Sequence, residues 1–544
     1  MGFARQNLLS HLRPGLAKAL PEFLVKQRWF GGKARPIRSA EIVDAMAVPF
    51  GASSAYLTLV QVTYTESKKE TYVLPLISPS KNWGDLLKTS DKPSPELRIR
   101  DEADGKEVVF YDALWDSGFA DRLLELIDSE VEIAGEMGSI VSRHTNAIRR
   151  LWDQSPSTAK PSLMRAEQSN TSVAYGDRLI LKFFRRLEEG INPDLEIGAF
   201  LTENVSFPHI PPMAGAIEFR QPGAQPSTLA FLQGFVVNQG DAWRHTLRAL
   251  QTYFPTVAAQ AVQPGGLLVP RLSLRALSQR TPPAQLLGLI GTYLQDAQLL
   301  GQRTAELHVA LASDSTNPAF APEPFSQAFQ DSLSQAMQDL ASQVLPLLRK
   351  RRAELPWESQ QDAQTVLSRE GEIGERFRSV AGSEISAMRT RLHGDYHLGQ
   401  VLFTGSDFVI IDFEGEPARP LIERRAKRSP LQDVAGMLRS FHYAALTGLM
   451  QYVSSHPVDT DRFAILEGWA QFWYAWVSAS FLKGYFAAAD RAPFLPWSPR
   501  ELDILLNAFL LEKAVYELGY ELNNRPDWVG LPLRGILHLL EQSK

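Results

Sequence analysis

The stretch from residue 391 to residue 416 places acidic and amide side chains at intervals that suit phosphoryl transfer. Asp395 lies five residues before Gln400, and Asp412 follows the apolar run 408–411, which predicts a buried strand whose end faces a site. Phosphoryl transfer requires a carboxylate beside the attacking hydroxyl and oxygen ligands that hold Mg²⁺ against the phosphates. We therefore expect Asp395 to accept or orient the acceptor hydroxyl, Gln400 and Asp412 to bind the metal, and His393 to brace the loop.

A purely structural explanation of the same loop has to be weighed. The tripeptide His393-Gly394-Asp395 by itself is also compatible with a loop closed by an Asx turn. The catalytic interpretation is favoured because protein kinases have the same interval between the catalytic aspartate and a metal-binding amide. Gln400 stands where those kinases have asparagine, so the metal ligand is shifted by one methylene.

Lys182 is the only lysine in the apolar strand predicted at 179–184. A lysine on a buried strand is costly unless its ammonium is paired, so we expect Lys182 to bind the α- and β-phosphates as the strand lysine of kinases does. Asn192-Pro193 predicts a helix start, and Glu196 in its first turns is the expected partner of Lys182. A lysine that reaches solvent at a sheet edge and a solvated glutamate are the alternative.

Two further segments around this lysine are candidates for nucleotide contacts. Residues 162–175 read as strand, polar turn and strand; the turn has no glycine, so hydroxyl and amide groups would supply donors, and an ordinary hairpin is the alternative. The apolar run 228–237 predicts the strand and hinge whose backbone receives adenine, against a buried strand with no ligand. The nucleotide candidates are Gln168, Ser169, Asn170, Thr171, Ser172, Lys182, Glu196, Gln233, Phe235 and Val237.

The predicted helix at 505–524 carries charged and tyrosine side chains every three or four residues, which places them on one face. Carboxylates, amides and aromatic rings bind sugars, so such a face suits a sugar site. Solvated pairs between successive turns are the alternative.

Composition limits the class of protein. The chain has 544 residues, enough for two or three structural units, with 44% apolar and 22% charged residues and a net charge of −5, which argues against a general nucleic-acid binder. It has no cysteine, so disulfides and thiolate chemistry are excluded. Charges interrupt the apolar residues at the start of the chain, and no uncharged run is long enough for a bilayer, so we expect a cytoplasmic protein without membrane contact.

The remaining patterns predict the elements that position these candidates. We expect an amphipathic helix over about 7–27, broken at Pro14, then strands of a curved sheet over 37–76 and a helix over 112–130. From about residue 241 the chain reads as helical, and His308 is expected to be a core histidine. Residues 31–33 lack the spacing of a phosphate-binding P-loop and predict a structural turn.

The segment HGDYHLGQ (393–400), together with 411–445, RWFGGKAR (28–35) and 510–540, closely resembles the maltokinases, within the aminoglycoside-phosphotransferase-like group of eukaryotic-type kinases. The resemblance implies an α+β, bilobal protein-kinase-like fold with an extra N-terminal α+β cap (1–130), a kinase N-lobe (131–240) and a mostly helical C-lobe (241–544). It also implies the sugar-binding residues His397, Glu414, Arg419, Lys513, Tyr516 and Tyr520.

The same resemblance implies ATP and Mg²⁺ as cofactors and maltose as the acceptor. The product would be maltose 1-phosphate, which the family supplies to α-glucan and glycogen synthesis from trehalose, with trehalose synthase as a partner protein. Glucosamine kinases share the architecture, so another acceptor sugar is the alternative. A non-catalytic scaffold for trehalose synthase is a third hypothesis, against which the intact Asp395, Gln400, Asp412 and Lys182 argue.

Overall fold

The computed structural model describes residues 3–78, 96–101, 105–152, 160–164, 170–259, 272–417 and 419–541, with the side chains of all of these except 3–10 and 285. The candidates Gln168 and Ser169 lie outside the described residues. The chain divides into two compact units, Met1–Val237 and Asn238–Lys544.

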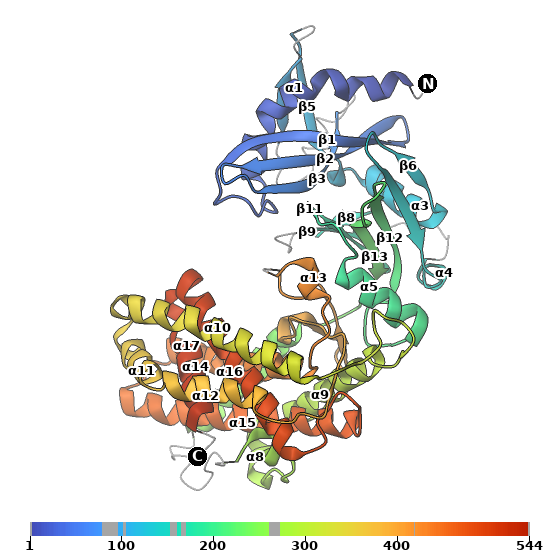
Figure 1. Cartoon of the computed structure of the whole chain (residues 1–544). Coiled ribbons are helices and arrows are strands. Elements are labelled where there is room, and N and C mark those ends of the chain that lie inside the picture. The colour runs from blue at the N-terminus through green and yellow to red at the C-terminus, as the bar shows by residue number, and fades with distance from the viewer. Residues whose placement is uncertain are drawn as a thin grey trace. The chain divides into compact units, whose positions relative to one another are not determined.

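Unit 1 contains two largely antiparallel sheets (Figure 1). The first has the order β1-β2-β3-β5-β4, with β11 also paired to β3. Its strands are β1 (Ile37–Phe50), β2 (Ser53–Tyr64), β3 (Lys69–Ile77), β4 (Leu97–Arg100), β5 (Glu107–Asp112) and β11 (Arg186–Leu187). Alternating burial along β1 shows why this segment forms a strand with one face toward the core.

The second sheet of unit 1 has the order β6-β7-β12-β13-β10-β9-β8. Its strands are β6 (Glu132–Ala134), β7 (Ser139–His144), β8 (Ser162–Leu163), β9 (Asn170–Tyr175), β10 (Leu179–Phe184), β12 (Met213–Arg220) and β13 (Ser227–Gly234). The helices of the unit are α1 (Phe3–Lys26), α3 (Ser117–Ser129), α4 (Ile148–Leu151) and α5 (Pro193–Phe200).

The first sheet buries side chains on both faces. On one face α1 packs through Leu12, Leu16 and Leu20, and on the other face residues of both sheets and α3 form a single core. The predicted break at Pro14 is wrong, since α1 runs through Pro14 and Pro21. Proline removes one backbone donor per position, and the packing of the leucines against the sheet offsets that loss.

Three polar connections join the two sheets within unit 1. Asp44 of β1 is fully buried and accepts the backbone N–H groups of Glu136, Met137 and Gly138 in the turn between β6 and β7, at 2.7 to 3.1 Å. Arg185, which follows the lysine strand β10, donates to Asp112 of β5 at 2.6 Å. The chain then enters β11 and pairs with β3, so the strand that carries Lys182 is continuous with the first sheet.

Unit 2 is mostly helical (Figure 1). Its helices are α6 (Ala242–Ala259), α7 (Leu274–Ser278), α8 (Ala284–Ile290), α9 (Tyr293–Leu311), α10 (Gln327–Arg351), α11 (Trp357–Ser368), α12 (Glu370–Ala381), α13 (Leu421–Arg424), α14 (Leu431–Ser455), α15 (Thr460–Ala489), α16 (Pro499–Asn524) and α17 (Gly530–Glu541). Two short two-stranded sheets accompany them, β14 (Glu323–Pro324) with β15 (Met388–Arg389), and β16 (Val401–Phe403) with β17 (Phe408–Ile410).

Helices α9 and α15 touch along their backbones, which fixes the centre of the unit. A Cβ atom at Gly301 would lie 1.9 Å from the carbonyl oxygen of Phe481, and one at Gly484 would lie 1.9 Å from that of Gln298. Only glycine fits at these two crossings. His308 of α9 is fully buried and bonds to Tyr485 and Asp433, which confirms that it is a core histidine.

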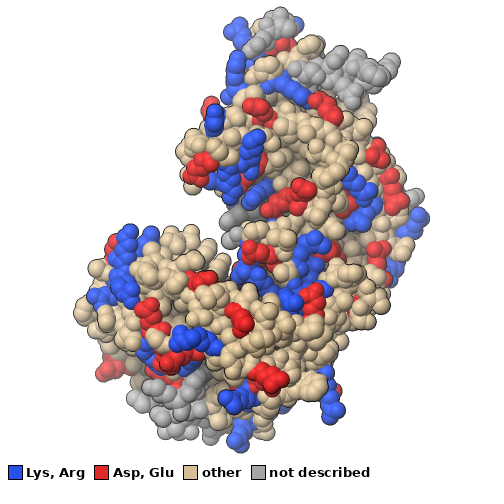
Figure 2. Space-filling view, in the orientation of Figure 1, with Lys and Arg blue, Asp and Glu red and all other residues tan. Residues whose placement is uncertain are grey.

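No helix among the described residues is both long enough and apolar enough to cross a lipid bilayer. Basic and acidic side chains are interspersed over the face that Figure 2 shows, and they do not form one continuous basic field there. The mixed α+β architecture is the fold class that the sequence predicts.

Candidate functional site

The loop that carries Asp395 is held from below by Asp433 in the first turn of α14. The buried Asp433 carboxylate accepts the backbone N–H groups of His393 at 2.7 Å and Gly394 at 3.0 Å, and it lies 3.2 Å from Nε2 of His308. Burial disfavours the charged form, but the bond and charge of His308 outweigh it and lower the pKa of Asp433. An ionised carboxylate thus fixes the loop, and Gly394 supplies the left-handed φ of +87° that the turn requires.

His393 ties the loop to the end of β17. Its Nε2 lies 2.9 Å from the carbonyl oxygen of Ile411, and its Nδ1 accepts the backbone N–H of Asp395 at 3.3 Å. Both contacts are made by the tautomer that carries its proton on Nε2. The imidazole therefore sets the distance between the loop and the segment that leads to Asp412.

Gln400 and Asp412 lie together as the spacing predicts. The amide Nε2 of Gln400 donates to Oδ2 of Asp412 at 2.9 Å, and carboxylate oxygens of Asp412 and Glu414 lie within 4.8 Å of one another. Asp412 has φ of +70°, a left-handed conformation that costs a non-glycine residue about 1–2 kcal/mol. Oxygen atoms of these side chains are the type of ligand that Mg²⁺ prefers, so the residues fit a magnesium ion.

Asp395 lies in a cluster of charges contributed by α16 and the segment after β17. Lys513 Nζ is 3.7 Å from Asp395 and 3.4 Å from Glu416, and Arg419 Nε donates to Glu416 at 2.5 Å. Lys513 also lies 4.9 Å from the ring centroid of Tyr516, within range of a cation–π contact. Three residues predicted for sugar binding are thereby brought to the loop of Asp395.

Burial and neighbouring charges act in opposite directions in this cluster. Burial disfavours the ammonium of Lys513, but the carboxylates of Asp395 and Glu416 outweigh it and raise the Lys513 pKa. Burial likewise disfavours the carboxylate of Glu416, while Lys513 and Arg419 lower its pKa. For Glu512 burial prevails over the nearby arginines and raises the pKa to about 6.

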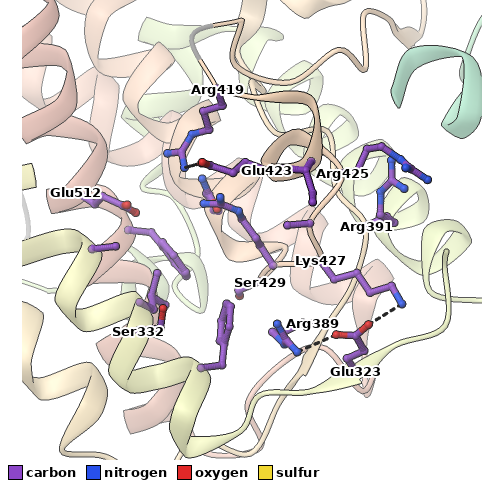
Figure 3. A pocket seen from close by; sticks show the side chains of 18 of the residues that line it. Glu323, Ser332, Arg389, Arg391, Arg419, Glu423, Arg425, Lys427, Ser429 and Glu512 are labelled. Carbon is purple, nitrogen blue, oxygen red and sulfur yellow. Dashed lines mark hydrogen bonds and ion pairs between the residues drawn. The ribbon is translucent and has the colours of Figure 1, made fainter. Parts of the chain in front are cut away.

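Two cavities share a wall beside this cluster. The smaller, which we call the Asp395 cavity, measures about 30 Å³ and is lined by Asp395, Glu416, Lys513 and others. The larger, which we call the arginine-lined cavity, measures about 720 Å³ and is lined by several basic residues of the segment 419–428 (Figure 3). Their shared lining residues are Leu340, Arg419, Gln432, Phe509, Glu512 and Tyr516.

The remaining sugar candidates lie nearby with fewer contacts. His397 accepts the backbone N–H of Gly399 on Nδ1 at 3.0 Å, and its Nε2 is 3.9 Å from Asp395. Partial burial lowers the pKa of His397. Tyr520 is 48% exposed beside Arg525, and in the described part of the chain it is not among the residues that line either cavity.

In unit 1 the strand lysine is paired. Lys182 Nζ lies 3.3 Å from Asp194 Oδ2, and both side chains are largely buried. Asp194 belongs to α5, whose N-cap is Asn192, so the predicted helix start is confirmed. Glu196, the expected partner, stands in the same first turn, two residues beyond Asp194.

The other nucleotide candidates lie in the second sheet. Asn170, Thr171 and Ser172 form the start of β9 opposite β10, and the hydroxyl of Thr171 accepts from Arg185 Nε at 2.8 Å. Gln233 lies in β13, and Phe235 just beyond it donates its backbone N–H to the carbonyl of Arg178 at 2.7 Å. Val237 is 72% exposed at the end of unit 1.

Three acidic residues were not named as site residues from the sequence: Asp194, Glu416 and Asp433. Asp194 and Asp433 lie in the first turns of α5 and α14, and their contacts with Lys182 and with the Asp395 loop come from tertiary packing. Glu416 stands two residues after Glu414, and this spacing alone could have marked it as an equal candidate.

Comparisons with known proteins match two parts of this chain. Residues 23–116 match the maltokinase N-terminal cap domain, and residues 239–451 match the phosphotransferase enzyme family.

Among characterised sequences, a glucosamine kinase of Mycolicibacterium smegmatis is 26% identical over 410 residues, which cover 74% of this chain and 85% of that protein. A glucosamine kinase of Streptacidiphilus jiangxiensis is 23% identical over 381 residues, covering 69% and 72%. A solved glucosamine kinase, in complex with glucosamine, ADP and inorganic phosphate, superposes with a TM-score of 0.59 at 18% identity over 95% of this chain and 98% of that one. The two share a kinase-like fold.

Proposed function

We propose that this chain phosphorylates maltose at the anomeric hydroxyl with Mg²⁺-ATP, because residues 239–451 match the phosphotransferase enzyme family and residues 23–116 match the maltokinase N-terminal cap domain. The product is maltose 1-phosphate, a precursor for α-glucan and glycogen synthesis from trehalose. The observation that carries the phosphotransfer is the contact of Asp395 with Lys513 beside a cavity. The cap domain is what favours maltose among acceptors.

In this proposal Asp395 is the catalytic residue. Its carboxylate accepts the proton of the acceptor hydroxyl while that oxygen bonds to the γ-phosphorus and the bond to the β–γ bridging oxygen breaks. Lys513 and Tyr516 position the sugar beside Asp395, with His397, Glu414, Arg419 and Tyr520 as further sugar contacts. His393 and Asp433 hold the loop, as their bonds to its backbone support.

The nucleotide roles follow from the same assignment. Gln400 and Asp412 are the residues that would hold Mg²⁺, which when bound would neutralise charge on the phosphates. Lys182 contacts the phosphates, and the hinge backbone at Gln233, Phe235 and Val237 contacts adenine. The phosphate-loop residues are Gln168, Ser169, Asn170, Thr171 and Ser172. The Lys182 ammonium lies beside Asp194, which supports its role as the phosphate-binding lysine, and Glu196 is the remaining nucleotide-binding residue.

The three-part division at about residues 130 and 240 and the association with trehalose synthase belong to this proposal, as does a cytoplasmic location. Glucosamine is the second candidate acceptor, because the two relatives named above are glucosamine kinases. A non-catalytic scaffold is disfavoured by the assembled Asp395 cluster.

The deciding experiment measures Mg²⁺-ATP turnover with maltose, glucosamine, glucose and trehalose in parallel, and identifies the product by phosphorus NMR. Turnover on maltose that gives an acid-labile anomeric phosphate supports the proposal. Preference for glucosamine would replace the acceptor and retain the catalytic residues. The absence of turnover on all four sugars would overturn the enzymatic assignment.

A further inference from the structure

The arginine-lined cavity carries more positive charge than any neutral acceptor requires. Its lining contains six basic side chains and three acidic ones, an excess of three positive charges in a chain whose net charge is −5. The basic residues are Arg389, Arg391, Arg419, Arg425, Lys427 and Arg428. The acidic ones are Glu323, Glu423 and Glu512.

The acids that are present are already shared among the bases. Glu323 binds both Arg389 at 2.8 Å and Lys427 at 2.9 Å, as the dashed lines in Figure 3 show. Glu423 reaches Arg419 at 3.8 Å, and burial raises the pKa of Glu512 to about 6, so this carboxyl is still mostly ionised at pH 7. The lining therefore does not balance its own charge.

Arg428 shows where the imbalance is largest. Its side chain is half-buried on the cavity wall, and its guanidinium makes no hydrogen bond or ion pair with any residue that the structure describes. Burial, followed by the nearby Arg419, lowers the pKa of Arg428, and the charges of Glu512, Glu416 and Glu423 oppose this shift without cancelling it. A desolvated cation of this kind gains free energy from a bound anion.

The other lining residues make the cavity suitable for a small organic anion. Ser332, Ser429 and Gln432 offer hydroxyl and amide groups, whereas Phe329 and Phe509 offer apolar surface. A volume of about 720 Å³ lies within the usual range for small-molecule sites.

We propose that the arginine-lined cavity binds an anionic group, a carboxylate or a phosphate monoester, with Arg428 as its principal contact and Arg425 and Arg419 beside it. The anion has two conceivable sources: an acidic substituent on the acceptor itself, or a separate small anion that binds next to the acceptor. The inference does not rest on maltose being the acceptor, because charge and volume alone carry it.

The test is calorimetric titration of the full-length protein with sulfate, which keeps two negative charges between pH 5 and 8. Mg²⁺ and β,γ-methylene-ATP are present at saturation so that the nucleotide phosphate site is filled. Wild-type protein binds sulfate, and Arg428→Gln weakens that binding by about tenfold or more, the effect of one charge-assisted hydrogen bond. Arg428→Lys keeps the charge and should lose less affinity for sulfate. This variant therefore distinguishes loss of the charge from a folding defect.

The matched control is Arg349→Gln, which removes an exposed arginine of α10 that pairs with Glu370 outside the cavity. Its affinity for sulfate stays at the wild-type value. The proposal is overturned if wild-type protein does not bind sulfate, or if Arg428→Gln binds it as tightly as wild type.

Competition identifies the source of the anion. If sulfate raises KM for the acceptor without changing kcat, the cavity belongs to the acceptor, and acidic sugars should be better substrates than their neutral counterparts. If sulfate binding depends on Arg428 but leaves KM for the acceptor unchanged, a separate anion binds in the cavity. Both outcomes require the calorimetric signal, so they remain informative even if the enzyme does not phosphorylate maltose.

Discussion

Unit 1 and unit 2 each place a carboxylate beside a cation, but the two carboxylates differ in what surrounds them. In unit 1, Glu70 of β3 accepts from Arg35 at 2.7 Å, Tyr64 at 2.8 Å and Tyr72 at 2.9 Å, and is 7% exposed. In unit 2, Asp395 lies beside Lys513 and lines a cavity. A carboxylate that is enclosed by its partners stabilises the fold. A carboxylate that faces a cavity is available to bind a ligand.

The sharpest test of this contrast is Asp395→Asn. We expect kcat to fall by about 10²–10⁴-fold, since the amide cannot accept the acceptor proton, while the thermal midpoint changes little. The measurement is ATP-dependent turnover with the acceptor that the wild type prefers. Asp339→Asn, on the exposed face of α10, is the matched control and should retain full activity. Wild-type kcat in Asp395→Asn would show that the catalytic carboxylate lies elsewhere.

Glu70→Gln should give the opposite result, a loss of stability with unchanged kcat in the folded protein. Burial disfavours the Glu70 carboxylate, but its bonds to Arg35 and the two tyrosines lower the pKa to about 2. A carboxyl with a lowered folded-state pKa stabilises the protein above its unfolded pKa of about 4.3 and loses that contribution as the pH falls toward 2. We expect about 2–3 kcal/mol less free energy of unfolding at pH 7.

The pH dependence provides the check on Glu70. Chemical denaturation between pH 2 and pH 7 should show wild-type stability decreasing with acid more steeply than that of Glu70→Gln. Parallel curves for the two proteins would mean that the Glu70 cluster contributes nothing specific to stability. Glu70 would then not be the stabilising carboxylate with which Asp395 is compared.

Lys513→Met should weaken transition-state binding without unfolding the protein. Removal of the ammonium leaves Asp395 and Glu416 without their shared cation, so kcat/KM for the acceptor should fall by about 10- to 100-fold. Steady-state kinetics with varied acceptor measures this. Lys350→Met, at an exposed position of α10, is the control. Equal kcat/KM for Lys513→Met and wild type would place the acceptor away from α16.

The smallest expected effect concerns Glu512, which faces Arg419, Arg428, Glu416 and Lys513. Because burial raises the pKa of Glu512 to about 6, the side chain is neutral below that pH and negative above it. Sulfate affinity should therefore rise severalfold as the pH falls from 7.5 to 5. In Glu512→Gln this step should disappear, with high affinity at both pH values. A pH profile that the substitution leaves unchanged would separate Glu512 from the arginine-lined cavity.

Local patterns were sufficient to predict much of the fold. The apolar run after residue 407 is β17, the tyrosine-bearing helix is α16, and Asn192 caps α5 as expected. These features depend on neighbours in sequence, where periodicity and capping act. Pro14 was interpreted wrongly because the leucines that hold α1 helical do so through a sheet formed later in the chain.

The candidate site was predictable only where spacing alone decides. Gln400 and Asp412 sit on adjacent segments of one hairpin, so their contact follows from the hairpin. The hydrogen bond of Asp433 to the Asp395 loop joins residues about 40 positions apart. The contact of Lys182 with Asp194 depends on how α5 packs against β10. Neither contact is encoded in a local sequence pattern. The cavity beside the segment 419–428 required the packing of α10, α14 and α16 as well.

The buried Asp44 carboxylate bears on whether the cap can be treated as a separable module. A chain shortened to begin after residue 130 would leave the amides of Glu136, Met137 and Gly138 without their acceptor, and Arg185 without Asp112. It would also remove β3, the strand that pairs with β11, and about half of the core that the two sheets share. The cap and the strand that carries Lys182 therefore belong to one folding unit, and unit 1 should unfold in a single cooperative step.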